Sequence, residues 1–273
     1  MALGGLMQTV SAFGRVQDAL SYFVESYDVI AQLAAVVRRL SGFTEHVDEV
    51  TRLESKVDRG ADDGESMKLQ DLVVELPDGR VLLDHCDLEL PRGVRLLVMG
   101  ASGCGKSTLL RMLAGIWPFG GGKVSIPSGD KALFLPQKPY LPLGSLRHAL
   151  QYPLSESGSD GQMAEVLEKV GLSHFAEKLD DVDDWSRILS LGEQQRLAFA
   201  RVLLVKPKWL FLDEATSALD EPREQEMYEL LRKELPDTGI ISVGHRSTLF
   251  AQHEQELRLN GNGGWQIQPI AGA

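Results

Sequence analysis

The sequence predicts an α/β fold in which a mostly parallel sheet surrounds a glycine-rich turn, with an amphipathic helix preceding this domain. Two observations carry the prediction. The apolar stretch LLVMG leads directly into the turn ASGCGKS, which is followed by the helix-forming segment TLLRMLAGI. Further along the chain, the apolar stretches ALFLP, WLFLD and GIISV are expected to be buried strands, and helical segments separate them.

Length and composition narrow the classes of protein that fit. The 273 residues, 43% of them hydrophobic, suit one large domain or one domain with an attachment. The formal net charge of -11 argues against a nucleic-acid-binding protein but does not exclude a nucleotide site, which needs only a local positive potential. Cys86 and Cys104 cannot form a disulfide framework and fit a reducing compartment. Cys104 lies in the glycine-rich turn, either as a reactive thiol or as a tolerated small residue.

The first part of the chain carries no secretory signal, because no basic residue precedes Arg15 and no compact apolar core follows. No apolar run approaches the roughly 18 to 20 residues that span a bilayer, so we expect that this chain alone does not cross a membrane. Between Val16 and Val37 apolar residues recur at alternate spacings of four and three, which predicts a helix that Gly42 would end. Its apolar face could pack on its own domain, pair with a second copy, or join a membrane domain.

The segment from Thr44 to Ser66 is acidic and glycine-containing, which is typical of a helix end that passes into a solvated linker. We therefore expect residues 1–66 to be an attached helix and linker, and the compact domain to begin at Met67. Two turns, PDG and PRG, then separate strands, the last of which enters the glycine-rich turn. After the helix that follows, Gly120 to Gly122 are expected to break the chain.

The glycine-rich turn fits the pattern G-x-x-x-x-G-K-[ST], whose backbone N–H groups face inward and cradle phosphates. The start of the next helix adds its positive dipole, and Lys106 meets the outer phosphate charges. We expect Ser107 to ligate Mg²⁺ and Thr108 to donate to a phosphate oxygen. The residues expected to bind phosphate in this turn are Gly100, Ala101, Ser102, Gly103, Cys104, Gly105, Lys106, Ser107 and Thr108.

Polar residues follow the other predicted strands at the edge where ligands sit in open α/β sheets. Asp213 can hold Mg²⁺ through water, and Glu214 can polarise the water that attacks the γ-phosphorus. Gln137 and His245 suit either ordinary loop positions or contact with the metal, the water or the nucleotide. The segment LSLGEQQR opens a helix from about Glu193, which is a second anion-binding helix start.

In this order, GASGCGKST, Gln137, LSLGEQQR, LFLDEATSALD and GHR resemble the ATPase subunit of ATP-binding cassette (ABC) proteins, over about Met67 to Gln268. The resemblance implies a P-loop NTPase core of ABC type with an antiparallel β subdomain and a helical signature subdomain at about residues 140–205. It also implies a head-to-tail dimer, here a homodimer. Two ATP molecules would lie between the phosphate loop of one copy and the signature LSLGE of the other.

The resemblance assigns a role to individual residues. Ser190 and Gly192 would contact the γ-phosphate of the nucleotide held by the other copy, and Asp220 would belong to a loop that communicates between the two sites. The other nucleotide-binding residues implied are Gln137 and Glu193; the metal-binding residues are Ser107, Gln137 and Asp213; the catalytic residues are Lys106, Glu214 and His245.

Three positions depart from the family pattern. Leu191 stands where the common signature has its first glycine, and Glu193 where it has glutamine. Leu76 falls near the position where many relatives carry an aromatic residue that stacks on adenine. Because such stacking is worth about 1–3 kcal/mol, the preference for ATP over GTP stays open.

The pieces SGCGKSTLLRMLAGIWPFG and LFLPQKPYLPLGSLR look like the subfamily of peroxisomal fatty-acyl half-transporters and their bacterial relatives. The segment from Ala12 to Phe43 is similar to the end of their transmembrane domain. The resemblance thus implies an ATP-hydrolysing subunit at the cytoplasmic face of a membrane, attached through a transmembrane domain whose substrate the sequence does not name. The alternatives are a soluble ABC ATPase outside transport and a catalytically silent scaffold.

Overall fold

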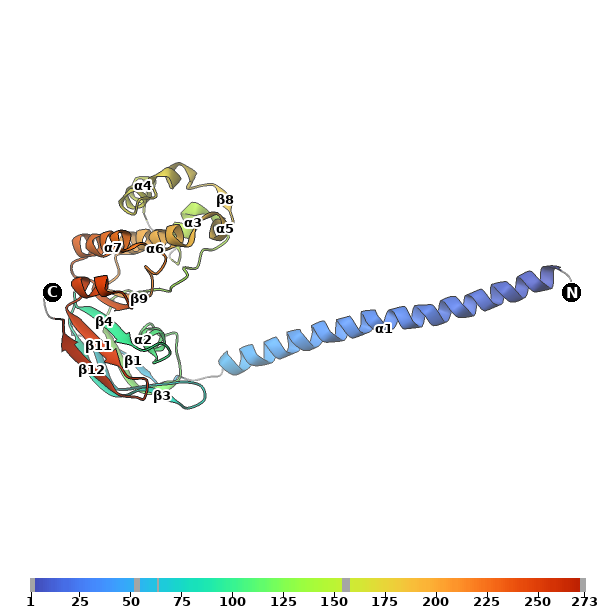
Figure 1. Ribbon diagram of the computed structural model, residues 1–273, viewed down its shortest axis with the longest axis horizontal. Coiled ribbons are helices and arrows are strands. Elements are labelled where there is room, and N and C mark those ends of the chain that lie inside the picture. Colours follow the sequence, from blue (N-terminus) through green and yellow to red (C-terminus); the bar gives the residue numbers. More distant parts are fainter. Residues whose placement is uncertain (1–2, 52–54, 63, 154–157, 271–273) are drawn as a thin grey trace. The chain divides into compact units, whose positions relative to one another are not determined.

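The computed structural model describes residues 3–51, 55–62, 64–153 and 158–270 (Figure 1). The chain divides into two units, Met1–Glu54 and Ser55–Ala273. The described part of the first unit is helical, whereas the second unit holds the sheets and the remaining helices.

The helix α1 runs from Leu3 to Thr51 without interruption. It begins before Val16 and passes through Gly42, so the expected helix end was wrong. A single interior glycine costs only about 1 kcal/mol, and the chain has no proline before Pro77 to stop the helix. Its large apolar side chains are exposed, for example Leu20 at 66%.

Exposed apolar side chains lie on more than one side of α1. Val29 and Val36 sit about 100° around the helix from Ile30 and Val37, and all four are exposed. The helix is therefore not amphipathic over its length, contrary to the expectation. By length and composition alone, Gly4–Asp48 is apolar enough to cross a membrane, which also corrects the expectation that no stretch approaches that requirement.

In the second unit, four strands form a sheet in the order β1-β5-β2-β3. The antiparallel part contains β2 (Met67–Glu75), β3 (Val81–Leu90) and β5 (Gly120–Pro127). Gly120 and Gly122 lie within β5 rather than breaking the chain. A Cβ on Gly120 would lie 2.0 Å from the carbonyl oxygen of Val73, so glycine allows β5 to approach β2.

Strand β1 (Asp58–Asp62) pairs in parallel with β5 from within the segment expected to be a linker. The second unit consequently begins at Ser55, before the expected boundary at Met67. The side chain of Arg59 reinforces this placement by donating to the carbonyl oxygens of Met112 and Leu113. The charged sequence DRGAD gave no sign of this strand.

The second sheet has the order β12-β11-β4-β10-β9-β6. All its neighbours are parallel except β12 against β11. The predicted buried strands are all present, so the mostly parallel sheet is confirmed. Its strands are β4 (Arg95–Gly100), β6 (Ala132–Leu135), β9 (Trp209–Asp213), β10 (Gly239–Val243), β11 (Gln255–Leu259) and β12 (Trp265–Pro269).

The remaining helices pack around this sheet. The helix α2 (Lys106–Leu113) buries Leu109, Leu110, Met112 and Leu113. Short elements of the expected helical subdomain gather at the end of this unit away from β3 (Figure 1). These short elements are β7 (Gly144–Ser145), α3 (Leu146–Gln151), α4 (Asp160–Lys169), η1 (Ser173–Lys178), β8 (Val182–Asp183) and α5 (Trp185–Ile188). The other helices of the unit are α6 (Leu191–Val205), α7 (Glu221–Glu234) and η2 (Ser247–Gln252).

Candidate functional site

The glycine-rich turn connects β4 to α2, and two of its glycines are required by close contacts. A Cβ on Gly100 would lie 2.4 Å from the carbonyl oxygen of Leu259, and one on Gly105 would lie 2.9 Å from Cβ of Leu82. Both glycines also have positive φ, 146° and 107°, which disfavour any other residue. The Cys104 thiol is buried, which favours the tolerated small residue over the reactive thiol.

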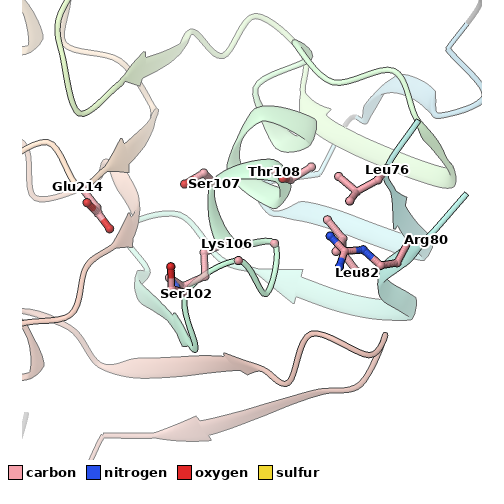
Figure 2. Close-up of a pocket in the computed structure, with 10 residues that line it drawn as sticks. Leu76, Arg80, Leu82, Ser102, Lys106, Ser107, Thr108 and Glu214 are labelled. Atoms are coloured by element: carbon pink, nitrogen blue, oxygen red, sulfur yellow. The ribbon is translucent and has the colours of Figure 1, made fainter. Parts of the chain in front are cut away.

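A cleft of about 210 Å³ opens beside this turn (Figure 2). Lys106 reaches along it and donates from Nζ to the carbonyl oxygens of Gly100 and Ala101, at 2.9 Å each. Among the residues that the structure describes, no side chain caps the start of α2, which leaves its first N–H groups available to an anion. The lining residues are Leu76, Arg80, Leu82, Ser102, Gly103, Gly105, Lys106, Ser107, Thr108 and Glu214.

Ser107 and Asp213 are in direct contact although they come from different elements. Ser107 Oγ donates to Asp213 Oδ1 at 2.6 Å, and Arg111 Nη2 lies 4.0 Å from Asp213 Oδ2. A hydroxyl beside a carboxylate is the kind of oxygen donor set that Mg²⁺ takes. The described residues contain no cluster of three or more His, Cys, Asp or Glu that could enclose a cation. A bound Mg²⁺ would therefore take its further ligands from phosphate and water, which fits its usual sites in proteins.

Side chains from two neighbouring loops lie close to the Glu214 carboxylate. Gln137 Nε2 donates to Glu214 Oε2 at 3.1 Å, and His245 Nδ1 lies 4.0 Å from Glu214 Oε1. Glu214 has a φ of 49°, in the left-handed region, and its N–H donates to the carbonyl oxygen of Val243 at 3.1 Å. That bond joins the end of β9 to β10 and holds the carboxylate at the edge where the glycine-rich turn lies.

Ser190 stands at the start of α6, where the sequence predicted a helix start. It forms a capping box with Glu193: Glu193 N–H donates to Ser190 Oγ at 3.3 Å, and Ser190 N–H donates to Glu193 Oε2 at 2.9 Å. A hydrogen bond from the Ser190 hydroxyl lowers the pKa of Glu193. Because a capping box accepts Glu or Gln at this position, Glu193 forms the helix start that a glutamine there could also form.

The remaining predicted residues lie outside the cleft. A Cβ on Gly192 would lie 3.3 Å from the carbonyl oxygen of Ala218, so this glycine allows the segment after Glu214 to pass close to α6. Asp220 is the N-cap of α7, and its Oδ1 accepts from Arg223 N–H at 3.0 Å. Ser190, Gly192, Glu193 and Asp220 do not line the cleft that holds Lys106, and their contact with nucleotide stays a prediction.

Sequence reasoning missed Gln195, which connects three parts of the site. Its side chain is fully buried; Nε2 donates to the carbonyl oxygen of Gln137 at 2.8 Å and to Ser217 Oγ at 3.2 Å, and Oε1 accepts from Ala218 N–H at 3.0 Å. Arg246 holds the same segment from the other side, donating to the carbonyl oxygens of Leu219 at 2.8 Å and Ser217 at 3.1 Å. A polar residue among the buried positions of α6 was the available signal.

Comparison with known proteins agrees with the expected fold and with the resemblance described above. Residues 83–217 match the family model described as ABC transporter. An uncharacterized ABC transporter ATP-binding protein of Haemophilus influenzae is 52% identical over 72% of this chain and 33% of its own length. The human protein named ATP-binding cassette sub-family D member 3 is 36% identical over 75% of this chain and 32% of its own length.

A solved structure titled as a bacterial Atm1-family ABC exporter with ATP bound has a TM-score of 0.67 to this chain. At 24% identity, covering 86% of this chain and 45% of the other, this similarity concerns the fold alone. The chain thus spans less than half the length of each of these proteins.

Proposed function

Because the chain carries an ATP-binding domain of the ABC transporter family, we propose that it binds and hydrolyses ATP and thereby drives a substrate across a membrane. The observation that supports this most is the meeting of Lys106, the Ser107–Asp213 pair and Glu214 around one cleft. In the proposal, the N–H groups of the glycine-rich turn and of the start of α2 bind the phosphates. Lys106 exchanges its bonds to the turn's carbonyl oxygens for bonds to phosphate oxygens.

Ser107 and Asp213 would hold Mg²⁺, Ser107 directly and Asp213 through water. When bound, Mg²⁺ would neutralise and orient the terminal phosphate oxygens. The chain's own contribution is the oxygen pair, which is already joined at 2.6 Å.

Glu214 is the proposed base of the reaction. The oxygen of a water molecule forms a bond to the γ-phosphorus, the bond from that phosphorus to the bridging oxygen breaks, and Glu214 accepts the proton of the water. The bond from Gln137 to Glu214 Oε2 fixes the direction of the carboxylate. His245, whose Nδ1 lies 4.0 Å from Glu214 Oε1, would hold the γ-phosphate and the same water.

A second copy of the chain would complete the site. In the proposed head-to-tail homodimer, Ser190 and Gly192 at the start of α6 face the γ-phosphate bound by the other copy. The exposed apolar helix α1 would belong to, or pack in, a transmembrane domain, with the ATPase on the cytoplasmic face. The transported substrate would contact membrane helices, so no residue described above identifies it.

The proposal is tested by measuring MgATP binding and hydrolysis by the purified full chain in detergent. We expect the wild type to hydrolyse ATP, Glu214→Gln to bind ATP but hydrolyse it at least ~100-fold more slowly, and Lys106→Ala to lose binding. Glu229→Gln, an exposed glutamate on α7, is the matched control and should behave as wild type. Hydrolysis by Glu214→Gln at the wild-type rate would remove Glu214 from its role, and no ATP binding by the wild type would exclude the function.

A further inference from the structure

Glu224 is a buried carboxylate that takes no part in the reaction proposed above. It lies in the first turn of α7 and is only 2% exposed. Removing an ionised carboxylate from water is costly unless charged or hydrogen-bonding partners replace the water. Asp220 already caps the start of α7, and Glu221 already places a carboxylate in its first turn. The helix start therefore does not explain why a further carboxylate is buried here.

Each oxygen of the Glu224 carboxylate accepts a hydrogen bond from a threonine of a different segment. Thr216 Oγ1 donates to Oε1 at 2.5 Å, and Thr248 Oγ1 donates to Oε2 at 2.7 Å. The guanidinium of Arg246 supplies the opposite charge, with Nη1 at 3.6 Å from Oε1. One carboxylate on α7 thus joins the segment that follows β9 to the segment that follows β10.

These two segments carry the groups proposed to act on the attacking water. Thr216 comes two residues after Glu214, and Arg246 directly follows His245. The Arg246 guanidinium also donates to two carbonyl oxygens of the segment after Glu214, at 2.8 Å and 3.1 Å. Glu214 itself has a φ of 49°, a conformation that persists in residues other than glycine only where the surrounding structure holds it. The contacts of Glu224 and Arg246 are part of that surrounding structure.

A cavity of about 10 Å³ lies where the two segments meet. Its lining includes Glu214 and His245 together with Thr216, Glu224 and Arg246. This volume is close to that of a single water-sized probe, so the cavity has room for one water molecule at most. A shift of the buried carboxylate or of its partners would therefore be felt directly by the proposed base and by the histidine beside it.

We propose that Glu224 is a positioning residue for ATP hydrolysis, which holds the loops that carry Glu214 and His245 in register. It would act through Thr216 and Thr248 without contacting the nucleotide. The inference rests on the function proposed above and adds a residue to it. None of the partners of Glu224 named above belongs to the glycine-rich turn or to α2, so the residue should affect the rate of hydrolysis and not the affinity for ATP.

The test measures kcat for ATP hydrolysis and equilibrium binding of MgATP by the full chain in detergent. Glu224→Gln keeps the shape of the side chain but replaces one accepting oxygen with a donor and removes the charge opposite Arg246. Thr248→Val removes one hydroxyl from a side chain of the same shape, and Thr248→Ser restores that hydroxyl. Glu229→Gln, the same change at an exposed position of α7, is the matched control.

We expect Glu224→Gln and Thr248→Val each to lower kcat at least ~10-fold, with ATP affinity changed less than about twofold. Thr248→Ser should recover most of this loss, and Glu229→Gln should behave as wild type. Because Glu224 and Thr248 would act as a unit, the double variant Glu224→Gln with Thr248→Val should be no more than about twofold slower than Glu224→Gln alone.

A wild-type kcat in both Glu224→Gln and Thr248→Val would overturn the inference and leave the proposed function intact. An ATP affinity that falls in step with kcat, or losses that multiply in the double variant, would also overturn it, because either result indicates a general disturbance of the unit. If Glu224→Gln fails to fold, the comparison of Thr248→Val with Thr248→Ser decides the question. A wild type that hydrolyses no ATP would exclude the proposed function and this inference together.

Discussion

Gln137 donates from Nε2 to Glu214 Oε2 at 3.1 Å, although 77 residues separate them in the chain. This bond connects the loop after β6 to the loop after β9 and sets the direction of the proposed catalytic carboxylate. Gln137 also offers its backbone carbonyl oxygen to Gln195, so both its side chain and its backbone are engaged in the site.

Replacing Gln137 with glutamate should impair hydrolysis more than binding. The new carboxylate would stand where an amide now donates to Glu214, and two carboxylates so close cannot both stay ionised without cost. We expect ATP hydrolysis to fall by at least ~10-fold, with ATP affinity changed less than threefold, measured by steady-state phosphate release and equilibrium binding. Gln137→Ala, which removes the bond without adding charge, should be less severe. Wild-type hydrolysis by Gln137→Glu would contradict the role of this bond.

Gly105→Ala should destabilise the second unit and abolish phosphate binding. The residue has a φ of 107°, and its Cβ would meet Leu82 at 2.9 Å, so backbone strain adds to overpacking. Gly79→Ala is the control, since Gly79 has a φ of 83° but nothing within 4 Å of its Cβ. In urea unfolding, Gly105→Ala should cost ~2–4 kcal/mol and exceed Gly79→Ala by at least about 1 kcal/mol. Equal costs would mean that Leu82 moves aside freely.

Gln195→Glu should lower the free energy of unfolding by an amount that depends on pH. One carboxylate oxygen would replace the nitrogen that donates to the carbonyl oxygen of Gln137, and burial would raise the carboxyl pKa. When the pKa of a carboxyl group is higher in the folded than in the unfolded chain, the folded protein keeps its full stability only at pH values below the unfolded pKa. The free energy of unfolding then falls as the pH rises toward the folded pKa. We therefore expect the free energy of unfolding to fall further below wild type between about pH 5 and pH 8. Gln266→Glu, at an exposed position, should show no such trend.

Because of His253, we expect the free energy of unfolding of the wild type to depend on pH in the opposite direction. The buried imidazole contacts the carbonyl oxygen of Leu249 at 2.7 Å and Ser242 Oγ at 2.8 Å, and burial lowers its pKa to about 4. The hydrogen bond to the Leu249 carbonyl opposes this lowering of the pKa, and the charges of Arg95 and Arg232 contribute to it. Because the unfolded chain binds the proton more tightly, the free energy of unfolding should fall as pH drops from about 6.5 to 4, by up to ~1.4 kcal/mol per pH unit.

Urea unfolding of wild type and His253→Gln at pH 7, 6 and 5 measures this dependence. The variant lacks the titrating group, so its free energy of unfolding should be lower at pH 7 but should lose less on acidification. Parallel pH profiles for the two proteins would show that other groups cause the acid sensitivity.

The sequence was sufficient to predict those parts of the fold that depend on short, local patterns. Lys106 and Ser107 follow a spacing that phosphate binding demands, and Asp213 and Glu214 end an apolar strand, so their meeting at one sheet edge follows from parallel topology. The structure places Ser107 against Asp213 and Gln137 against Glu214, as this topology requires.

The remaining features depend on contacts between distant segments, which local patterns do not reveal. Strand β1 is charged, and its pairing is decided by the free edge of β5. Gly120 looked like a chain break, yet its missing Cβ is what allows β5 to approach Val73. Only the polarity of Gln195 marks it in the sequence, because its hydrogen-bond partners come from two other loops.

The pairing of β1 with β5 has a mechanical consequence for α2, the helix that begins at Lys106. Any pull on the chain before Ser55 reaches β1 within a few residues, and Arg59 in that strand is bonded to the carbonyl oxygens of Met112 and Leu113. Those carbonyls belong to the last two residues of α2, whose first residue is Lys106. Tension at the amino-terminal side of the second unit can thus be transmitted through the Arg59 guanidinium to α2, which begins with the lysine proposed to bind phosphate.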